Sequence, residues 1–417
     1  MTSQKGSIAV LMIILLIAGI AVGTLLVEQR TNFLPHAKEP KPNPSAATRI
    51  WKPDFFPVGV WLLLNDINSN NFPGIAQEFK DNGIDLIHLV WFNKNELPLL
   101  DIADKVGINV EIDELYLDGS WWKIKDPSLI TLERARSLIY PVVDLYKTHP
   151  SVKSYFVVDE PEIQSNYLPQ LTKKITFATQ AFQERDPARP AYVNNLSPYS
   201  VREYSTNTAS DILSADIYSY DYTKQSCTGR DNSRASFINS IKAFNNARPQ
   251  TKPFWVILQA FSNPTSRMPT KSELRTQQWI SIGEGVKGII WFIYNGDSNL
   301  TGFSNNPEIK QEIYKLAKRI APFKQLLLSL EKTSSLSDTS LRFDKEPGYL
   351  GYLKDKITGK QYVVLLNPDC RSNSLLKVTI RVRRSTPTLK DLETGQIYSS
   401  GDLIPFEAGD GRIFEIN

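Results

Sequence analysis

The chain has few residues of the kinds that form disulfide frameworks, metal sites and nucleophilic triads. Its 417 residues include two cysteines and three histidines. Cys227 and Cys370 fall in different parts of the expected fold, so no disulfide framework is indicated, although the two could pair in an extracellular protein. His36, His88 and His149 are far apart, and neither a zinc site nor a histidine-activated nucleophile can be assembled from them. We therefore expect no metal and no organic cofactor.

A strong charge of one sign is also absent. The formal net charge is +4 at pH 7, and the basic residues are scattered, so the sequence does not indicate a nucleic-acid-binding surface. A glycine-rich phosphate turn is missing as well, because the first apolar run reads Val58-Gly-Val-Trp-Leu-Leu-Leu64. This disfavours a doubly wound nucleotide-binding sheet, which is the main alternative to a barrel.

Eight short, nearly continuous apolar runs are the main pattern of the chain. They lack the alternation of a half-exposed strand, which is typical of parallel strands covered on both faces. Between them, apolar residues recur three or four apart and predict helices. Eight strands alternating with helices predict a (β/α)8 TIM barrel, a fold of about 250 residues. The runs are Phe56–Leu63, Ile84–Phe92, Ile108–Ile112, Val152–Val158, Pro190–Val193, Ile212–Tyr218, Pro253–Leu258 and Val286–Ile293.

The amino-terminal residues differ from this pattern. Ile8 to Val27 is an uninterrupted apolar run, long enough to cross a bilayer as a helix. We interpret residues 1–30 as a transmembrane anchor that places the globular part outside the cell; a cleaved signal segment, which would give a secreted protein, is the alternative. Residues 31–50 contain four prolines and predict a stiff linker.

The carboxyl-terminal residues show short strand patterns separated by turn residues. The barrel is expected over residues 51–328, and residues 329–417 predict a small antiparallel β-sandwich. The predicted strands are Tyr349–Leu353, Gln361–Leu366, Leu376–Val382, Thr388–Leu392 and Arg412–Ile416. The sequence does not indicate an oligomeric state.

The most informative run is Tyr155-Phe-Val-Val-Asp-Glu-Pro161, an apolar strand that ends in two carboxylates. Unpaired carboxylates are costly to bury, so Asp159 and Glu160 are expected at the carboxyl end of the strand, where TIM-barrel active sites lie. Acidic, amide and aromatic residues follow the other strands too. This combination is typical of a sugar-binding cleft, because carboxylates catalyse glycoside hydrolysis and aromatic faces pack on sugar rings.

Four strand ends carry motifs that resemble clan A glycoside hydrolases, including the family 42 β-galactosidase-like group. The likeness covers roughly Phe56 to Leu328, and the order of the motifs carries it. It implies that Glu160 is the general acid/base, with Asp159 in place of the asparagine that contacts the sugar in that clan. The motifs are Asp159-Glu-Pro161, Ala215-Asp-Ile-Tyr-Ser-Tyr-Asp221, Trp255-Val-Ile-Leu-Gln-Ala-Phe261 and Gly288-Ile-Ile-Trp-Phe-Ile-Tyr294.

The resemblance fails at one important position. The clan's nucleophile is a glutamate at the end of strand seven, where this chain has Gln259, and an amide cannot supply the attacking oxygen. Three interpretations remain open. The second carboxylate could be another residue, first Asp216 and then Asp221 or Glu114; the barrel could bind glycans without cleaving them; or Glu273 could take the role.

The sequence therefore predicts a glycoside hydrolase-like protein acting on O-glycosidic bonds of a cell-surface or environmental polysaccharide. Glu160 is expected as the general acid and Asp216 as the second carboxylate. A non-catalytic, membrane-tethered glycan-binding or envelope-scaffolding pseudoenzyme is the alternative. The expected substrate-binding residues are Asp159, Asn194, Tyr218, Gln259, Trp291, Tyr294, Trp61, Trp91 and Glu114.

Several candidates also have a purely structural interpretation. Glu160 could stabilise the start of the helix after Pro161, and Asp159 could pair with a basic residue. Tyr218 could be a core residue, and His88, inside a strand, is most simply a hydrogen-bonded core residue.

Overall fold

The computed structural model describes residues 51–90, 92, 96–113, 120–163, 168–223, 233–249, 251–334, 339–343, 348–367, 369–382 and 387–417. The predicted membrane segment, the proline-rich linker and two site candidates, Trp91 and Glu114, lie outside these ranges. Within them, no helix combines the length and the apolar character needed to cross a bilayer.

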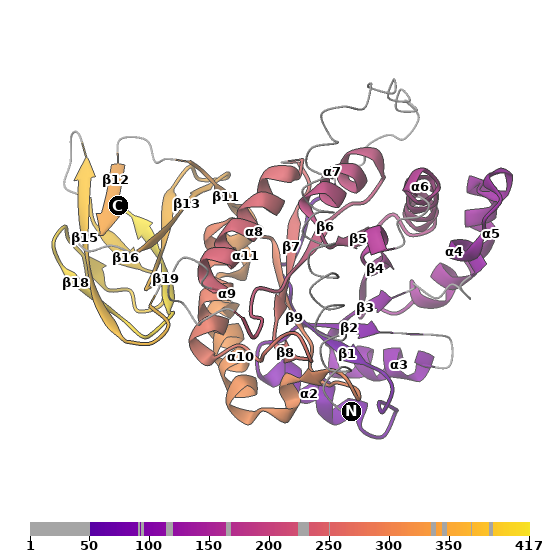
Figure 1. Ribbon diagram of the computed structural model, residues 1–417, viewed down its shortest axis with the longest axis horizontal. Coiled ribbons are helices and arrows are strands. Elements are labelled where there is room, and N and C mark those ends of the chain that lie inside the picture. Colours follow the sequence, from indigo (N-terminus) through magenta and orange to yellow (C-terminus); the bar gives the residue numbers. More distant parts are fainter. Residues whose placement is uncertain are drawn as a thin grey trace, which may run out of the picture. The chain divides into compact units, whose positions relative to one another are not determined.

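Eight parallel strands close into a barrel in the order β1-β2-β3-β4-β5-β6-β7-β9 (Figure 1). Each strand coincides with one of the eight apolar runs, which confirms the predicted TIM barrel. The strands are β1 (Val58–Leu63), β2 (Leu86–Val90), β3 (Asn109–Asp113), β4 (Val152–Val158), β5 (Ala191–Asn195), β6 (Leu213–Ile217), β7 (Phe254–Gln259) and β9 (Gly288–Phe292). A separate two-stranded antiparallel sheet of β8 (Phe261–Ser262) and β10 (Thr301–Gly302) joins the loops after β7 and β9.

Helices follow the strands, and polar caps fix where several of them begin. The Ser197 hydroxyl accepts from Ser200 N–H at the start of α7, and Thr270 accepts from Glu273 N–H at the start of α9. Such caps satisfy backbone donors that a helix start leaves free. The helices are α2 (Phe72–Asp81), α3 (Leu97–Val106), α4 (Ser120–Lys123), α5 (Leu132–Tyr146), α6 (Leu168–Arg185), α7 (Pro198–Asn207), α8 (Ser233–Ala247), α9 (Lys271–Gly283), α10 (Pro307–Ile320) and α11 (Lys324–Ser329).

The barrel strands bury both of their faces. In β1, Val60 and Leu62 belong to the apolar layer between strands and helices, whereas Trp61 and Leu63 belong to the cluster inside the barrel. Successive side chains of a strand point to opposite faces. This explains why the strands read as continuous apolar runs, and it also decides which residues can reach the barrel mouth.

Two antiparallel sheets follow the barrel. All five strands predicted for this region are present, and four more, β11, β12, β17 and β18, were not predicted. One sheet has the order β11-β13-β14-β19-β16-β17 and the other β12-β15-β18, and residues of both share one apolar cluster. The strands are β11 (Leu330–Lys332), β12 (Thr339–Phe343), β13 (Tyr349–Asp355), β14 (Gln361–Leu366), β15 (Ser374–Val382), β16 (Leu389–Asp391), β17 (Ile397–Tyr398), β18 (Leu403–Phe406) and β19 (Gly411–Ile416).

Helix α9 of the barrel packs against the larger of these sheets. The backbones approach so closely that a Cβ atom at Gly351 would lie 2.5 Å from the Cα atom of Gly283. Trp279 Nε1 donates to Asp410 at 3.1 Å. Cys370, whose carbonyl accepts from the α9 residue Ser272, is disulfide-bonded. The sequence had not indicated a disulfide; the other cysteine, Cys227, lies outside the described residues.

Candidate active site

Three neighbouring strands bring acidic and amide side chains together at their carboxyl ends. Strand β5 pairs with β4 on one side and β6 on the other. From this central position, Asn194 Nδ2 donates to Asp159 Oδ1 at 2.9 Å and to Asp216 Oδ1 at 2.7 Å. Ser214 Oγ donates to Asn194 Oδ1 at 2.9 Å, which fixes the amide with its donor side toward the two carboxyl groups. The structure therefore groups three of the predicted site residues.

Glu160 completes this cluster through a hydrogen bond between its side chain and that of Asp216. Its backbone has φ 38°, in the left-handed region that residues other than glycine seldom occupy, and it directly precedes Pro161. Such strained residues are concentrated at active sites and ligand clamps. The conformation is therefore a second reason, besides the charge, to regard Glu160 as functional rather than as a helix-start residue.

The carboxyl groups of this cluster hold protons that exposed carboxylates would lose. Burial raises the pKa of Asp216 well above its ordinary value, and the charges of Asp159 and Glu160 raise it further. Burial also raises the pKa of Asp159, to about 7, against the hydrogen bond from Asn194. Burial raises the pKa of Glu160 above its ordinary value, and the hydrogen bond with Asp216 opposes this shift. The shared proton therefore lies on Asp216, which donates to Glu160.

Tyr218 belongs to the same cluster. Burial raises the pKa of its hydroxyl, and the charge of Asp216 raises it further. Its ring packs against Phe261, with centroids 5.0 Å apart, and against Phe292, at 5.6 Å. Tyr218 thus has one polar end at the carboxyl pair and an apolar body in the barrel mouth.

Trp61, expected from the sequence to bind substrate, lies in the apolar cluster inside the barrel, and its faces are occupied. The indole stacks on the imidazole of His88, with centroids 3.9 Å apart and an interplanar angle of 5°. The edges of Phe156 and Phe292 contact it from other directions. We assign Trp61 to the support of His88 rather than to a sugar platform.

Gln259 faces the barrel interior, but its side-chain amide is fully hydrogen-bonded to the backbone of other loops. Its Oε1 accepts from Tyr220 N–H at 3.0 Å, and its Nε2 donates to the carbonyls of Tyr220 at 3.1 Å and Arg267 at 3.0 Å. Since an amide has two donors and one carbonyl oxygen, this side chain is occupied in tying the loop after β6 to the loop after β8.

Two aromatic candidates lie away from the cluster. Trp291 is 0% exposed and packs in the layer between the strands and the helices, on the opposite face of β9 from Phe292. Tyr294 belongs to the same layer and directs its hydroxyl to Glu78 of α2, at 3.5 Å. The structure therefore does not bring either residue to the carboxyl pair.

Asp221 and Glu273, the other residues considered for the role of second carboxylate, have hydrogen-bond partners of a structural kind. Asp221 accepts from the backbone and hydroxyl of Thr223, at 2.9 and 2.5 Å. Glu273 accepts from both terminal nitrogens of Arg267, at 2.8 and 2.7 Å, and from Thr270 N–H at 2.9 Å. Glu273 is a helix cap with a buried ion pair, so Asp216 remains the carboxyl group that contacts Glu160.

Sequence reasoning missed the buried acid of β3, Glu111, which is 0% exposed. It is the register partner of His88 in β2, and Asp113 follows it at the end of β3. The signal was a glutamate inside the apolar run Ile108–Ile112, because a charge in a strand buried on both faces requires a partner inside the protein.

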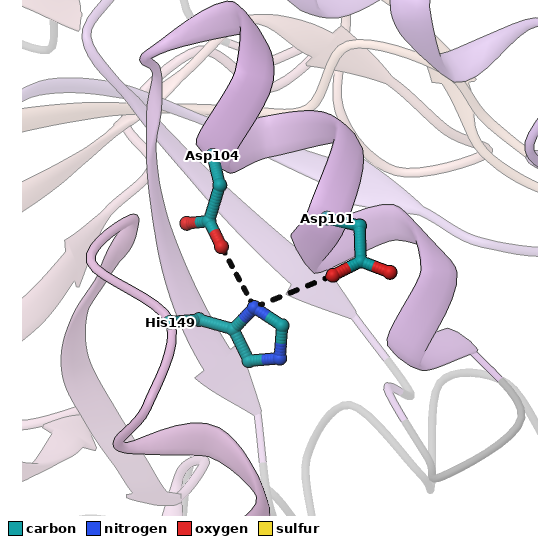
Figure 2. Close-up of side chains that lie close together, drawn as sticks. All are labelled: Asp101, Asp104 and His149. Atoms are coloured by element: carbon teal, nitrogen blue, oxygen red, sulfur yellow. Dashed lines mark hydrogen bonds and ion pairs between the residues drawn. The ribbon is translucent and has the colours of Figure 1, made fainter.

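A group with the ligand types of a metal site lies at the opposite end of the barrel. Figure 2 shows Asp101 and Asp104 of α3 on either side of His149, whose Nδ1 is 2.8 Å from Asp104 Oδ2 and 3.9 Å from Asp101 Oδ1. The other Asp104 oxygen accepts from Ser151 N–H at 2.8 Å. These contacts satisfy one another and hold the loop before β4 against α3, and we interpret them as structural.

The fold is similar to that of known β-galactosidases. The β-galactosidase of Bacillus circulans sp. alkalophilus aligns with a TM-score of 0.63 and 9% identity, over 87% of this chain and 99% of that one. The enzyme of the psychrophilic Marinomonas ef1 aligns with a TM-score of 0.52 and 13% identity, over 66% of this chain. That of Rahnella sp. R3 aligns with a TM-score of 0.53 and 12% identity, over 68% of this chain.

The chain spans 62% of the length of the Marinomonas enzyme and 58% of that of the Rahnella enzyme. No family model matches the chain, and no curated protein matches it either. At these identities the likeness establishes a shared TIM-barrel fold, and the chemistry has to be argued from the residues of this chain.

Proposed function

We propose that this protein is a glycoside hydrolase that cleaves O-glycosidic bonds of a polysaccharide, with Glu160 as the general acid and Asp216 as the second carboxylate. The hydrogen-bonded carboxyl pair at the ends of β4 and β6 carries this proposal. Glycoside hydrolysis requires one protonated and one ionised carboxyl group. Two coupled carboxyl groups that share one proton supply both forms near neutral pH.

The direct hydrogen bond between Glu160 and Asp216 is consistent with an active site that has no substrate bound. Retaining glycosidases hold their carboxyl groups about 5–5.5 Å apart and inverting ones about 6.5–9.5 Å, and a direct hydrogen bond is shorter than either spacing. In the proposed reaction, the proton passes from Asp216 to Glu160 and then to the glycosidic oxygen, which becomes the new partner of Glu160. Asp216 then remains ionised, and its carboxylate either attacks the anomeric carbon or activates the water molecule that does so.

Two neighbours stabilise Asp216 in that ionised form. Asn194 donates to it at 2.7 Å, and the hydroxyl of Tyr218 is close enough for the charge of Asp216 to raise its pKa, so this hydroxyl is the second donor assigned to the ionised form. Hydrogen bonds to an ionised acceptor are about twice as strong as those between neutral groups. Both donors therefore favour the step in which Asp216 loses its proton. Asp159, held by the same amide, is assigned to a sugar hydroxyl.

We further propose that the barrel works outside the cell, anchored through the apolar run Ile8–Val27. The disulfide of Cys370 supports an oxidising compartment, because disulfides are rare in the reducing cytosol. A cell-surface or environmental polysaccharide is the substrate class that such a position makes accessible.

A second candidate function is glycan binding without cleavage. The observation that favours it is Gln259, which stands at the strand-seven end and is fully engaged with the backbone of other loops. In that case, the carboxyl cluster would serve only as acceptors for sugar hydroxyls.

The test uses the full-length protein in detergent, incubated with a broad panel of polysaccharides while released reducing ends are measured. We expect release by the wild type, loss of at least about a hundredfold in Glu160→Gln or Asp216→Asn, and no change in Asp221→Asn. The last variant removes a matched carboxylate that caps a loop turn. Glycan-induced thermal stabilisation without release, in wild type and variants alike, would establish the binding function instead.

A further inference from the structure

The turn after β4 carries Glu160 and is attached on both sides of that residue to one neighbouring segment. Before Glu160, the side chain of Asp159 accepts from Asn194 of β5 at 2.9 Å. After it, the side chain of Glu162 accepts from residues between β5 and α7. Glu160 and Pro161 lie between these two attachments, so the position of the proposed general acid is set from both sides.

One oxygen of the Glu162 side chain forms the second attachment. Its Oε1 accepts from Leu196 N–H at 2.5 Å, from Ser197 N–H at 2.9 Å and from the Ser200 hydroxyl at 2.6 Å. Hydrogen bonds weaken as they lengthen or bend. An oxygen that accepts from three donors therefore has little freedom to move, because any shift weakens at least one of these bonds.

Helix α7 has a cap of its own, so it does not require Glu162 for that purpose. The Ser197 hydroxyl accepts from Ser200 N–H at 3.2 Å, and Ser200 Oγ accepts from Ser197 N–H at 3.3 Å. This capping box already gives both backbone donors a partner. Glu162 comes from a different loop, and its hydrogen bonds join that loop to the start of the helix.

Glu160 needs such support because its backbone is strained. Its φ is 38°, a region that costs a residue other than glycine on the order of 1–3 kcal/mol, and the following proline restricts it further. The Glu160 carbonyl accepts from Ile163 N–H at 3.0 Å, which closes the turn over Pro161 and Glu162. Strained residues persist where the surrounding structure holds them in place, and the attachments on either side of Glu160 do so here.

We propose that Glu162 is a positioning residue for Glu160: its hydrogen bonds to the start of α7 hold the turn after β4 in the conformation that directs the Glu160 side chain to Asp216. The inference rests on the proposed function and deepens it, because it assigns the residue that orients the general acid of the same site. In this role Glu162 does not touch substrate. Its effect depends on where its oxygen reaches and not on its charge.

Three substitutions at Glu162 separate reach from charge. Glu162→Ala removes the acceptor. Glu162→Asp keeps the charge on a side chain one methylene shorter, so its oxygens fall about 1.5 Å short of the donors. Glu162→Gln removes the charge but keeps a carbonyl oxygen of the same reach. The Ala and Asp variants are therefore expected to lose the positioning effect, and the Gln variant is expected to keep it.

The first measurement is amide hydrogen exchange of the full-length protein in detergent, which requires no catalytic activity. The Ile163 amide reports on the turn, and the Leu196 and Ser197 amides report on the attachment. In Glu162→Ala and Glu162→Asp all three should exchange at least about tenfold faster through local opening. In Glu162→Gln they should exchange nearly as in the wild type. The Tyr155 amide inside β4 should change less than these three, because the opening is local.

The second measurement is the rate of sugar release. Glu162→Ala and Glu162→Asp should lower kcat about ten- to a hundredfold with little change in KM, because a misplaced general acid slows the chemical step more than it weakens binding. Glu162→Gln should retain most of the rate. Asp355→Ala is the matched control. Asp355 accepts from Ile357 N–H at 2.9 Å and from the Thr358 hydroxyl at 2.7 Å in the turn between β13 and β14, and its loss should leave kcat and the Ile163 exchange rate unchanged.

Should Glu162→Ala not fold, Glu162→Asp provides the same comparison. Unchanged exchange of the Ile163 amide in Glu162→Asp would overturn the inference, as would faster exchange with an undiminished kcat. A Glu162→Gln variant as slow as Glu162→Asp would assign the effect to charge and overturn it too. Sugar release absent from the wild type would refute the hydrolase, and the exchange rate of the Ile163 amide would still decide whether Glu162 holds the turn.

Discussion

Gln259 and Tyr220 exchange hydrogen bonds in both directions: the backbone N–H of Tyr220 donates to Gln259 Oε1 at 3.0 Å, and Gln259 Nε2 donates back to the Tyr220 carbonyl at 3.1 Å. A glutamate here would keep the first bond and lose both amide donors, so its second oxygen would face two carbonyls. We expect Gln259→Glu to lower the free energy of unfolding by about 1–3 kcal/mol, measured by urea unfolding, and to produce no gain in sugar release.

The exposed Gln311→Glu variant of α10 is the control for the added charge, and it should leave both quantities near the wild-type values. A large gain in sugar release by Gln259→Glu would contradict this prediction, since it would mean that a carboxylate at strand seven restores a nucleophile. The loops after β6 and β8 would then have to tolerate the loss of the two hydrogen bonds that Gln259 Nε2 donates to them.

The barrel could be predicted from the sequence, but the direction of individual side chains could not. A strand buried on both faces has no polar alternation to mark its inner side. Trp61 and Trp291 look equivalent in the sequence, yet Trp61 lies inside the barrel and Trp291 against the helices. Four of the terminal strands escaped prediction: β11, β17 and β18 are very short, and β12 pairs with β15, which is distant along the chain.

For the polar residues of the site, too, the sequence indicated which residues matter but not which partners they contact. Asp159, Glu160 and Asp216 could be predicted because each carboxylate interrupts or ends an apolar run. The pairing of His88 with Glu111 depends on the register between β2 and β3, and the engagement of Gln259 depends on loops that only the folded chain brings close. Sequence patterns reveal which polar residues need partners, while the register decides which partners they find.

Stability should decrease as the pH rises from about 5 to 9. Burial raises the pKa of Asp159 from 3.8 to about 7, so its contribution is fully present below pH 3.8 and is lost as the pH rises through 7. Burial lowers the pKa of His88, but the hydrogen bond with Glu111 and the nearby carboxylates of Glu111 and Asp113 outweigh it and raise this pKa from 6.5 to about 9. Its contribution is present below pH 6.5 and lost as the pH rises through 9.

Urea unfolding at a series of pH values measures this dependence. The combined loss is expected to be on the order of a few kcal/mol. Asp159→Asn should flatten the curve between pH 4 and 7, and His88→Gln should flatten it between pH 6.5 and 9. A wild-type curve that rises toward pH 9 would be incompatible with the buried groups described here.

Arg319 should contribute strongly to the packing of α10 against the terminal sheet. Its NH1 is 2.6 Å from Asp410 Oδ1 and its NH2 is 2.9 Å from Glu393 Oε1, and its guanidinium lies over Trp279 at 5.0 Å. Removing one partner of such a buried network leaves carboxylates unpaired, so Arg319→Ala is expected to cost about 3–5 kcal/mol.

Arg136 provides the comparison, because it pairs with Glu184 at 2.8 Å on an exposed surface. Arg136→Ala should change the unfolding midpoint little, since exposed ion pairs are screened by solvent. Arg319→Lys should fall between the two, because an ammonium keeps the charge but loses the planar fork that reaches both carboxylates. Equal losses in Arg319→Ala and Arg136→Ala would show that the interface depends on apolar packing alone.

The redox state of Cys370 should show in which compartment the protein resides. The chain contains two cysteines, and Cys370, at the contact with α9, is disulfide-bonded. We expect the protein, alkylated during cell lysis, to show no reactive thiol when unfolded before reduction and two after it. Cys370→Ser should lower the free energy of unfolding by about 2–5 kcal/mol, as should reduction of the wild type. Two thiols already alkylated at lysis would place the barrel in a reducing compartment and argue against the exported protein proposed here.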